Sequence, residues 1–365
     1  MSVITDYYTK EEKAVVALRD LFEKFGYRKF KMSRFEEYEL YSKNKNFLEN
    51  DNIITITDLN GKLLALKPDV TLSIVKNTLA GDNDFSGEQK VYYNENVYRV
   101  SENTHQFKEI MQAGLECIGD IDLYDIFETV SLAAQSLALI SEDFVLQISH
   151  LGVLSAVLEK ISPDQAFQQK VITCMKSKNP HDLARLCEQQ GVDGTQLLQL
   201  LNAYGPRSKV LSQLESLDCP ALQELKELSG LLDQLPWGDK IVFDFSAVNN
   251  MNYYNGIVYR GFLSGICESV LAGGQYDKLM EKLDRRAGAV GFAVYLDLLE
   301  QMPGEEEEYD VDVLLLYEAD TDKAAVAKAV SALTSVGKTV STQKSIPQKL
   351  RYRKLMKLSK EGTLC

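Results

Sequence analysis

The chain has 365 residues, of which 45% are hydrophobic, so it is too long for one compact core and predicts two or three domains. Its formal net charge of −13 predicts an acidic surface that repels phosphates, which disfavours non-specific binding to nucleic acid. No apolar run reaches the roughly 18 residues of a membrane span, and the N-terminus lacks the apolar stretch of a signal peptide. We therefore expect a cytoplasmic protein that does not contact membranes.

The cysteines are widely separated and include no Cys-x-x-Cys pair and no histidine at ligand spacing. There are six of them: Cys117, Cys174, Cys187, Cys219, Cys267 and Cys365. This usage suits reduced cytosolic thiols. It argues against a zinc site and against a disulfide framework, and we expect neither a metal nor a cofactor.

The N-terminal segment predicts a helix followed by extended chain. Residues Thr9 to Phe25 carry apolar side chains at helical spacing and start with a capping box formed by Thr9 and Glu12. Gly26 is a typical helix terminator. An extended segment is predicted from Tyr27 to Leu40.

Residues 52–139 predict two strand pairs, each followed by a helix. Asn60-Gly61 is a typical two-residue hairpin turn, and Pro68 suits the first turn of a helix. The predicted elements are a hairpin over 52–66, a helix over 70–79, strands over 90–100 and 107–119, and a helix over 124–139.

A helical module is predicted from about residue 150 to 236, inserted between two parts of a sheet. The segment is rich in Leu, Gln and Ser and has apolar residues at helical spacing. Prolines and a glycine break it into short helices: Pro163, Pro180, Gly191, Pro206 and Pro220. His181 lies near a predicted helix start, and we expect it on the surface rather than in a catalytic site.

The stretch from Phe243 to Leu263 predicts two strands joined by a turn at Asn255-Gly256, which taken alone is a β-hairpin. Tyr253 and Tyr254 lie in the connection, where phenolic groups at a strand end suit a small-molecule site. Because neighbouring strand residues point to opposite faces, we expect at most one of these tyrosines to face a given pocket.

The last third predicts further strands and a small second domain. SVLAGGQYDKLM indicates a strand, a Gly-Gly turn and a helix, and AGAVGFAVYLDLLEQM indicates a strand leading into a helix. An acidic linker is predicted over 303–309. Residues 310–365 predict a βαβ unit with its helix over 322–336. The basic tail from Ile346 to Lys360 is expected to be a helix.

Four stretches in this order resemble motifs of the histidyl-tRNA synthetase group of class II aminoacyl-tRNA synthetases. LLALKPDVT is similar to the family's Leu-Arg-Pro-Glu-x-Thr, and YRVSENTHQFKEIMQAGLE to motif 2 and the Gln-x-Gly-x-Glu element. NNMNYYNGIVY and LAGGQYDKL resemble the two histidine signatures, while AGAVGFAVYLDLL takes the place of motif 3. The resemblance implies an α+β fold over 1–302, an antiparallel sheet flanked by helices, dimeric through the first helix and the extended segment.

The departures from the family pattern concern the cations that handle ATP, whose phosphates need positive neighbours. The arginine of the first histidine signature aligns with Asn249, and the motif 3 arginine aligns with Leu298. Gln275 replaces the arginine of the second signature. Motif 2 keeps Arg99, but Lys108 is the only Lys or Arg in the loop beyond it. Histidine activation by this chain is therefore not expected.

The resemblance also implies that an amino-acid pocket is retained. Its residues are Asp69, Arg99, Gln112, Glu116, Tyr253 and Tyr254. An imidazole can offer N–H groups to Glu116 and to a tyrosine hydroxyl. The α-ammonium group suits Asp69 and Gln112, and Arg99 suits the ligand carboxylate.

A synthetase-like chain that lacks the ATP-handling arginines but keeps the amino-acid pocket resembles the regulatory subunits of ATP phosphoribosyltransferase. The resemblance implies a chain without catalytic residues that activates a short-form catalytic subunit in the first step of L-histidine biosynthesis and takes part in feedback inhibition by L-histidine. It further implies a homodimer within a larger hetero-oligomer, without tRNA, and a truncated anticodon-binding-like unit over 310–365. Two alternatives stay open, a divergent histidyl-tRNA synthetase and a free-standing histidine-binding module.

Overall fold

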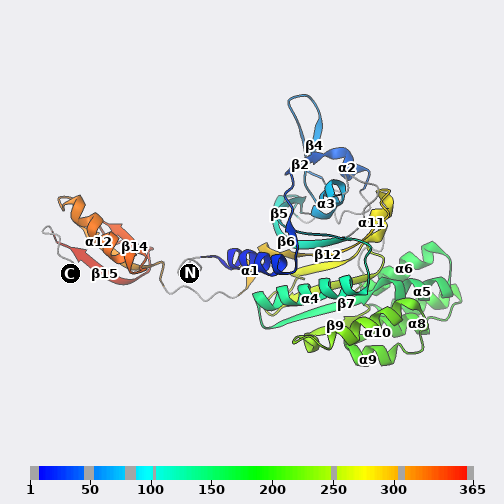
Figure 1. The fold of residues 1–365 in the computed structure, drawn as a ribbon. Coiled ribbons are helices and arrows are strands. Elements are labelled where there is room, and N and C mark those ends of the chain that lie inside the picture. Colours follow the sequence, from blue (N-terminus) through cyan, green and yellow to red (C-terminus); the bar gives the residue numbers. More distant parts are fainter. Residues whose placement is uncertain are drawn as a thin grey trace. The chain divides into compact units, whose positions relative to one another are not determined.

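The computed structural model describes residues 8–44, 53–78, 88–101, 104–247, 253–302 and 309–359. The chain forms two compact units, which are described separately below. The larger unit extends from Thr9 to Met302, and the smaller one contains residues 309–359. Figure 1 shows the chain coloured along its sequence.

The first helix, α1 (Lys10–Lys24), has the predicted capping box. Thr9 Oγ1 accepts the Glu12 N–H at 3.2 Å, and Glu12 Oε2 accepts the Thr9 N–H at 2.9 Å. Gly26 follows the helix with φ +83°, a left-handed conformation that glycine adopts without strain. The prediction of this helix and its two ends is confirmed.

A nine-stranded sheet forms the centre of the larger unit, in the order β1-β5-β6-β12-β11-β10-β7-β9-β8. Its strands are β1 (Arg28–Lys29), β5 (Gln89–Val100), β6 (Phe107–Gly119), β7 (Phe144–His150), β8 (Tyr204–Pro206), β9 (Ile241–Asp244), β10 (Ile257–Leu263), β11 (Leu271–Gln275) and β12 (Gly288–Tyr295). Neighbours are antiparallel except for β1 with β5 and β7 with β9. The six consecutive strands from β5 to β7 therefore form the predicted antiparallel sheet.

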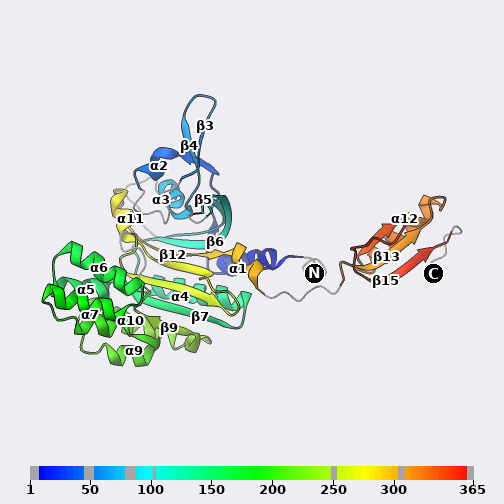
Figure 2. The same ribbon diagram turned by 180° about the vertical axis from the view of Figure 1, so that it is seen from behind.

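One face of the sheet packs against α1 and α4 (Leu123–Ile140); Figure 1 shows α4 in front of the central strands, and Figure 2 shows these strands from the other side. Gly261 of β10 permits this contact, because a Cβ there would lie 2.6 Å from Leu137 Cδ1. Among the helices in the described ranges, α4 is the one with the length and hydropathy of a membrane span. However, 61% of it is buried inside the unit, as in a core helix.

The opposite face carries α3 (Val70–Thr78), α11 (Asp277–Lys282) and a small sheet in the order β2-β4-β3. The small sheet consists of β2 (Phe35–Glu37), β3 (Thr55–Thr57) and β4 (Leu63–Leu66). The prediction of extended chain as far as Leu40 is wrong, because α2 (Tyr38–Ser42) begins before it. Burial explains the difference: Tyr41 is fully buried, and its hydroxyl lies 3.0 Å from Ser73 Oγ of α3.

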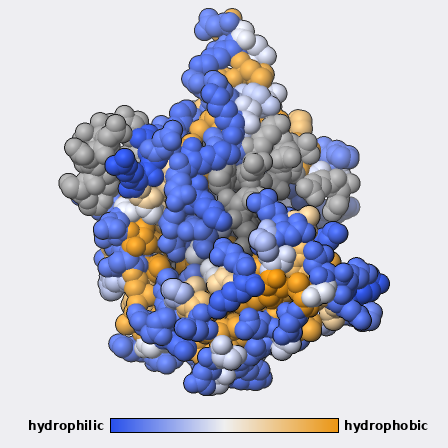
Figure 3. Space-filling model, turned by 90° about the vertical axis from the view of Figure 1, so that its right-hand side faces the viewer, coloured by the Kyte–Doolittle hydropathy of each residue, from blue (hydrophilic) through white to orange (hydrophobic). Residues whose placement is uncertain are grey.

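Six helices lie between β7 and β9 in the sequence. They are α5 (Leu151–Ile161), α6 (Gln165–Lys176), α7 (Pro180–Gln190), α8 (Thr195–Leu201), α9 (Arg207–Gln213) and α10 (Pro220–Leu232). Their buried leucines join the core on the α4 face. His181 is exposed at the start of α7. The surface seen in Figure 3 is mainly hydrophilic, with apolar residues in limited patches.

The predicted hairpin within residues 243–263 is wrong. β7 lies between β9 and β10 and pairs with both, in parallel with β9 and antiparallel with β10. The Asn-Gly pair serves other contacts: the Asn255 side chain bonds Asp277, and Gly256 O accepts the Leu151 N–H at 2.9 Å. Residues 248–252, Asn249 among them, lie outside the described residues.

The predicted Gly-Gly turn is also wrong, since Gly273 and Gly274 both belong to β11. A Cβ on Gly273 would lie 2.4 Å from Gly291 O, and one on Gly274 would lie 2.6 Å from Ile257 O. These glycines therefore allow close backbone approach within the sheet and do not reverse the chain.

The smaller unit is a parallel three-stranded sheet in the order β14-β13-β15 with one helix. Its elements are β13 (Val311–Tyr317), α12 (Lys323–Ser335), β14 (Val340–Gln343) and β15 (Tyr352–Leu358). The predicted βαβ order is confirmed. The predicted helix in the tail is wrong, because 352–358 pairs with β13 and buries Leu358 against Val313 and Leu315. Lys360, where that helix was expected to end, lies outside the described residues.

Candidate functional site

Two rows of cross-strand neighbours form the floor of a cavity on the α3 face of the sheet. The first row is Glu116, Gly291, Gly274 and Val258, and the second is Gly114, Ala293, Ala272 and Arg260. Residues two apart on a strand share a face, so both rows face the same side. The small side chains keep the space above them open: a Cβ on Gly291 would lie only 1.7 Å from Glu116 Oε2.

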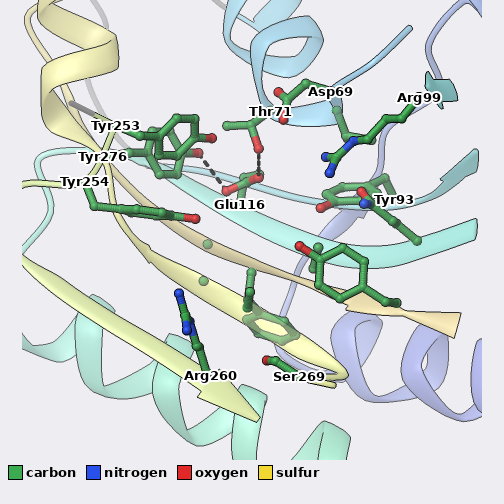
Figure 4. Close-up of a pocket in the computed structure, with 18 of the residues that line it drawn as sticks. Asp69, Thr71, Tyr93, Arg99, Glu116, Tyr253, Tyr254, Arg260, Ser269 and Tyr276 are labelled. Atoms are coloured by element: carbon green, nitrogen blue, oxygen red, sulfur yellow. Dashed lines mark hydrogen bonds between the residues drawn. The ribbon is translucent and has the colours of Figure 1, made fainter. Parts of the chain in front are cut away.

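The cavity above this floor measures about 750 Å³. All six residues predicted from the sequence line it: Asp69, Arg99, Gln112, Glu116, Tyr253 and Tyr254. Figure 4 shows five of them, with side chains from the sheet, the start of α3 and the segment before β10 converging on one space. Whether this space holds histidine stays a prediction.

Glu116 lines the cavity and is only 2% exposed. Thr71 Oγ1 donates to its Oε1 at 2.8 Å, and the Tyr276 hydroxyl donates to its Oε2 at 2.7 Å. Burial raises the pKa of Glu116 to about 8; the negative charge of Asp69 also raises it, whereas the two hydrogen bonds lower it. Near neutral pH this carboxyl group is therefore able both to give and to take a proton.

Three tyrosines cover one side of the cavity. The Tyr253 ring lies between the other two, with ring centroids 4.5 Å from Tyr254 and 5.7 Å from Tyr276. Burial, with a smaller effect of the Asp69 charge, raises the pKa of Tyr253 well above its ordinary value, so its hydroxyl stays protonated. The expectation that only one of Tyr253 and Tyr254 faces the pocket is wrong, because both precede β10 and escape the alternation of a strand.

Asp277, the first residue of α11, anchors the segment that carries these tyrosines. Its Oδ2 accepts the Asn255 side-chain amide at 3.0 Å and that of Gln275 at 2.7 Å, while its Oδ1 accepts the Ala289 N–H at 3.0 Å. Asn255 Oδ1 in turn accepts the Asp277 N–H at 2.9 Å. One carboxylate thus ties the residue after Tyr254 to β11 and β12.

Asp69 and Arg99 lie together where α3 begins (Figure 4). Asp69 Oδ1 accepts the Leu72 N–H at 2.8 Å, which satisfies a backbone donor of the first helical turn. Arg99 Nε donates to Pro68 O at 3.2 Å, so its guanidinium group is held on the Asp69 side of the cavity. Gln112, which is 4% exposed, comes from β6.

Sequence reasoning missed the other lining residues, among them Thr71, Tyr93, Tyr276 and Arg260. Two had a signal, because Thr71 ends the stretch LLALKPDVT and Tyr276 belongs to LAGGQYDKL. Tyr93 and Arg260 stand within long strands, where only the cross-strand register shows which face they occupy.

A group of potential metal ligands lies outside this cavity and consists of Glu88, Cys117 and Asp125. The Lys90 ammonium group lies 3.5 Å from Glu88 Oε2 and 3.8 Å from Asp125 Oδ1, so a cation already compensates these carboxylates. Burial raises the pKa of the Cys117 thiol, which disfavours the thiolate that a metal would need. We assign no metal to this group.

Curated relatives with similar sequences are named as regulatory subunits. The ATP phosphoribosyltransferase regulatory subunit of Oceanobacillus iheyensis is 27% identical over 334 residues, which cover 88% of this chain and 82% of the relative. The protein of the same name from Bacillus cereus is 25% identical over 332 residues, which cover 86% of this chain and 79% of the relative.

Solved structures show the same fold. An ATP phosphoribosyltransferase regulatory subunit/histidyl-tRNA synthetase from Bacillus halodurans aligns with a TM-score of 0.77 at 23% identity, over 94% of this chain and 90% of that chain. A chain of the ATP phosphoribosyl transferase (HisG:HisZ) complex from Thermotoga maritima aligns with a TM-score of 0.64 at 19% identity. The alignment covers 78% of this chain and 97% of that chain. A histidyl-tRNA synthetase from Nostoc aligns with a TM-score of 0.72 at 17% identity. The alignment covers 93% of this chain and 83% of that chain.

These likenesses confirm the predicted class II synthetase-like α+β fold. The family model described as Histidyl-tRNA synthetase matches residues 4–299, which is most of the chain. The chain therefore belongs to the histidyl-tRNA synthetase family.

Proposed function

We propose that this chain is a non-catalytic regulatory subunit that activates a short-form ATP phosphoribosyltransferase catalytic subunit and mediates feedback inhibition by L-histidine. The names of the Oceanobacillus and Bacillus relatives support the regulatory role, and the Thermotoga complex supports a catalytic partner. The observation that carries the proposal is a pocket with a buried carboxyl group, Glu116, suited to histidine, in a chain whose motif 3 cation is replaced by Leu298.

The pocket fits histidine because its polar groups match the two ends of the ligand. Glu116 and the hydroxyl of Tyr254 suit the two nitrogens of an imidazole, one of which can donate while the other donates or accepts. Asp69 and Gln112 offer oxygens for the α-ammonium group. Tyr253 and Tyr276 pack as rings and exclude water from the imidazole end.

The loss of ATP handling is supported by the surroundings of Leu298. This residue lies in η4 (Leu296–Gln301) and packs against the hydrophobic core, so it offers no charge to a triphosphate. Lys108 lies on β6 with an exposed side chain. Asn249, where the arginine of the first histidine signature is replaced, lies outside the described residues.

The proposal extends to the assembly and to the division of the chain. We infer a homodimer within a larger hetero-oligomer in the cytoplasm, without bound tRNA. Residues 1–302 then form the synthetase-like domain with its helical insertion at about 150–236. Residues 303–309 form a linker, and 310–365 form a truncated anticodon-binding-like unit.

Size-exclusion chromatography with a short-form catalytic subunit, combined with calorimetry of L-histidine, tests the proposal. We expect co-elution of the two chains, binding of L-histidine, and no histidine-dependent exchange of pyrophosphate into ATP. Exchange activity would instead identify a divergent synthetase. Histidine binding without co-elution would identify a free-standing histidine-binding module.

A further inference from the structure

The cavity extends beyond the six residues assigned to histidine, and two further basic residues, Arg260 and Lys176, line it. Arg260 comes from β10, and Lys176 is the last residue of α6. Figure 4 shows Arg260 and Ser269 across the cavity from Asp69. The acidic side chains, Asp69 and Glu116, stand on the side of α3 and β6. Arg260 is therefore a cation on the side of the cavity opposite Asp69 and Arg99.

The sheet register fixes the position of Arg260 relative to Glu116. Arg260 is opposite Ala272, which is opposite Ala293, and this row lies two residues along from the row of Glu116. Three strand spacings and two residues separate the two Cα atoms by about 16 Å in an ideal sheet. Both side chains extend into this gap, which leaves a space comparable in length to one amino acid.

Arg260 has small neighbours in its own row, namely Ala272, Ala293 and Gly114. Its half-buried guanidinium group therefore faces the cavity rather than a wall of side chains. Partial burial strengthens a charge-assisted hydrogen bond relative to one in water. An anionic group placed above Ala272 is thus within the reach of this residue.

The two serines that line the cavity do not supply donors for an anion. Ser269 Oγ donates to the carbonyl oxygens of Gly261 and Leu271, the latter at 2.7 Å. The Ser246 hydroxyl donates to Asp244. Anion binding beside Arg260 therefore depends on its guanidinium group.

Arg99 is a poorer partner for a carboxylate than the motif resemblance implies. Its Nε donates to Pro68 O, and its guanidinium group is held on the same side of the cavity as Asp69. A ligand carboxylate at this position would meet the negative charge of Asp69, which costs free energy. An α-ammonium group there is attracted instead.

We propose that Arg260 binds the α-carboxylate of the amino acid whose imidazole contacts Glu116. The long side chain of Arg260 then reaches the carboxylate, while the ammonium group on the same carbon atom faces the side of Asp69. This assignment rests on the proposed histidine site and adds a specificity: the pocket selects imidazole ligands that carry a carboxylate.

The test compares L-histidine with L-histidinol, in which a neutral hydroxymethyl group replaces the carboxylate, by titration calorimetry of the full-length chain. We expect the wild type to prefer L-histidine by at least about tenfold, the value of one charge-assisted hydrogen bond. Arg260→Gln loses this preference while its affinity for L-histidinol stays unchanged, and Arg260→Lys recovers part of it. Arg185→Gln, which removes an exposed arginine of α7 outside the cavity lining, is the matched control and keeps the preference.

The assignment is overturned if Arg99→Gln abolishes the preference and Arg260→Gln does not. It is also overturned if Arg260→Gln weakens both ligands equally, which indicates a structural role. Absence of binding of both ligands to the wild type would refute the histidine pocket itself, and the Arg260 assignment with it.

Discussion

The Tyr276 hydroxyl donates to Glu116 Oε2 at 2.7 Å, across 160 residues of sequence. Thr71 donates to the other carboxyl oxygen at 2.8 Å, so each oxygen of Glu116 has one partner from the protein. Each of these oxygens has lone pairs left for a ligand. Thr71 and Tyr276 therefore orient the buried carboxyl group of Glu116 toward the cavity. The ionisation of Glu116 connects ligand binding to pH.

L-Histidine should bind most tightly between about pH 6.5 and pH 8. The free imidazole has a pKa of about 6.5, and burial raises the pKa of Glu116 to about 8. Between these values the imidazole and the carboxyl group together hold the one proton that an imidazolium–carboxylate pair needs. Binding releases a proton below this range and takes one up above it. Calorimetry in buffers of different ionisation enthalpy measures both the affinity and the proton exchange.

Glu116→Gln provides the control for this pH profile, because glutamine has the shape of the side chain and, like the protonated acid, donates on one side and accepts on the other, but cannot ionise. We expect the upper limb of the profile, near pH 8, to disappear in this variant. A wild-type affinity that rises steadily from pH 6 to pH 9 would contradict the assigned role of Glu116.

The stability of the unliganded protein should also depend on Glu116. Because its folded-state pKa lies above the ordinary value of 4.5, the folded chain binds more protons than the unfolded chain between about pH 4.5 and pH 8. The free energy of unfolding attributable to this group therefore falls as pH rises through that range. The melting temperature of Glu116→Gln relative to the wild type should increase from pH 5 to pH 8. An equal difference at both pH values would show that Glu116 ionises normally.

Removal of the Asp277 carboxylate should weaken histidine binding through the position of the tyrosines. Asp277→Ala loses the acceptor of three hydrogen bonds, which costs about 1–3 kcal/mol of unfolding free energy. We expect at least tenfold weaker L-histidine binding, because the segment after Tyr254 is no longer fixed. Urea unfolding and calorimetry separate the two effects.

Glu281→Gln, an exposed change on the same helix, is the control for Asp277→Ala and should alter neither quantity. Unchanged histidine affinity in a destabilised Asp277→Ala chain would mean that Asp277 has no part in positioning the pocket.

Tyr254→Phe should weaken inhibition by L-histidine and leave activation of the catalytic subunit intact. The variant keeps the ring, which packs over Gly274, and removes only the hydroxyl proposed to contact the imidazole. Loss of one neutral hydrogen bond predicts about a three- to tenfold increase in the histidine concentration for half inhibition. Tyr124→Phe, at a position 58% exposed, is the matched control. Inhibition unchanged by Tyr254→Phe would remove this residue from the site.

The sequence predicted those elements whose signals are local. The capping box of Thr9 and Glu12 is complete within four residues, and α1 begins where it predicts. Strand pairing is not local: the stretch before β10 has a typical Asn-Gly turn, yet β7 separates the two strands that it joins. The strand at 352–358 shows the same limit, since it forms by pairing with β13, about 40 residues earlier in the sequence.

The residues of the pocket could likewise be predicted where their signal is local and not where it depends on strand pairing. Residues within recognisable motifs, such as Glu116 and Tyr254, could be placed at the site from the sequence. Tyr276 lay in such a motif too, but its hydrogen bond to Glu116 depends on the approach of β11 and β12. Arg260 carried no motif signal, because its position above the floor follows from the register of four strands.

Reconstitution with a short-form catalytic subunit tests regulation most directly. The measurement is the rate of product formation from ATP and phosphoribosyl pyrophosphate, with and without this chain, over a titration of L-histidine. We predict little activity from the catalytic subunit alone, strong activation by this chain, and inhibition by L-histidine that Glu116→Gln weakens. A rate that this chain leaves unchanged would contradict the proposed function.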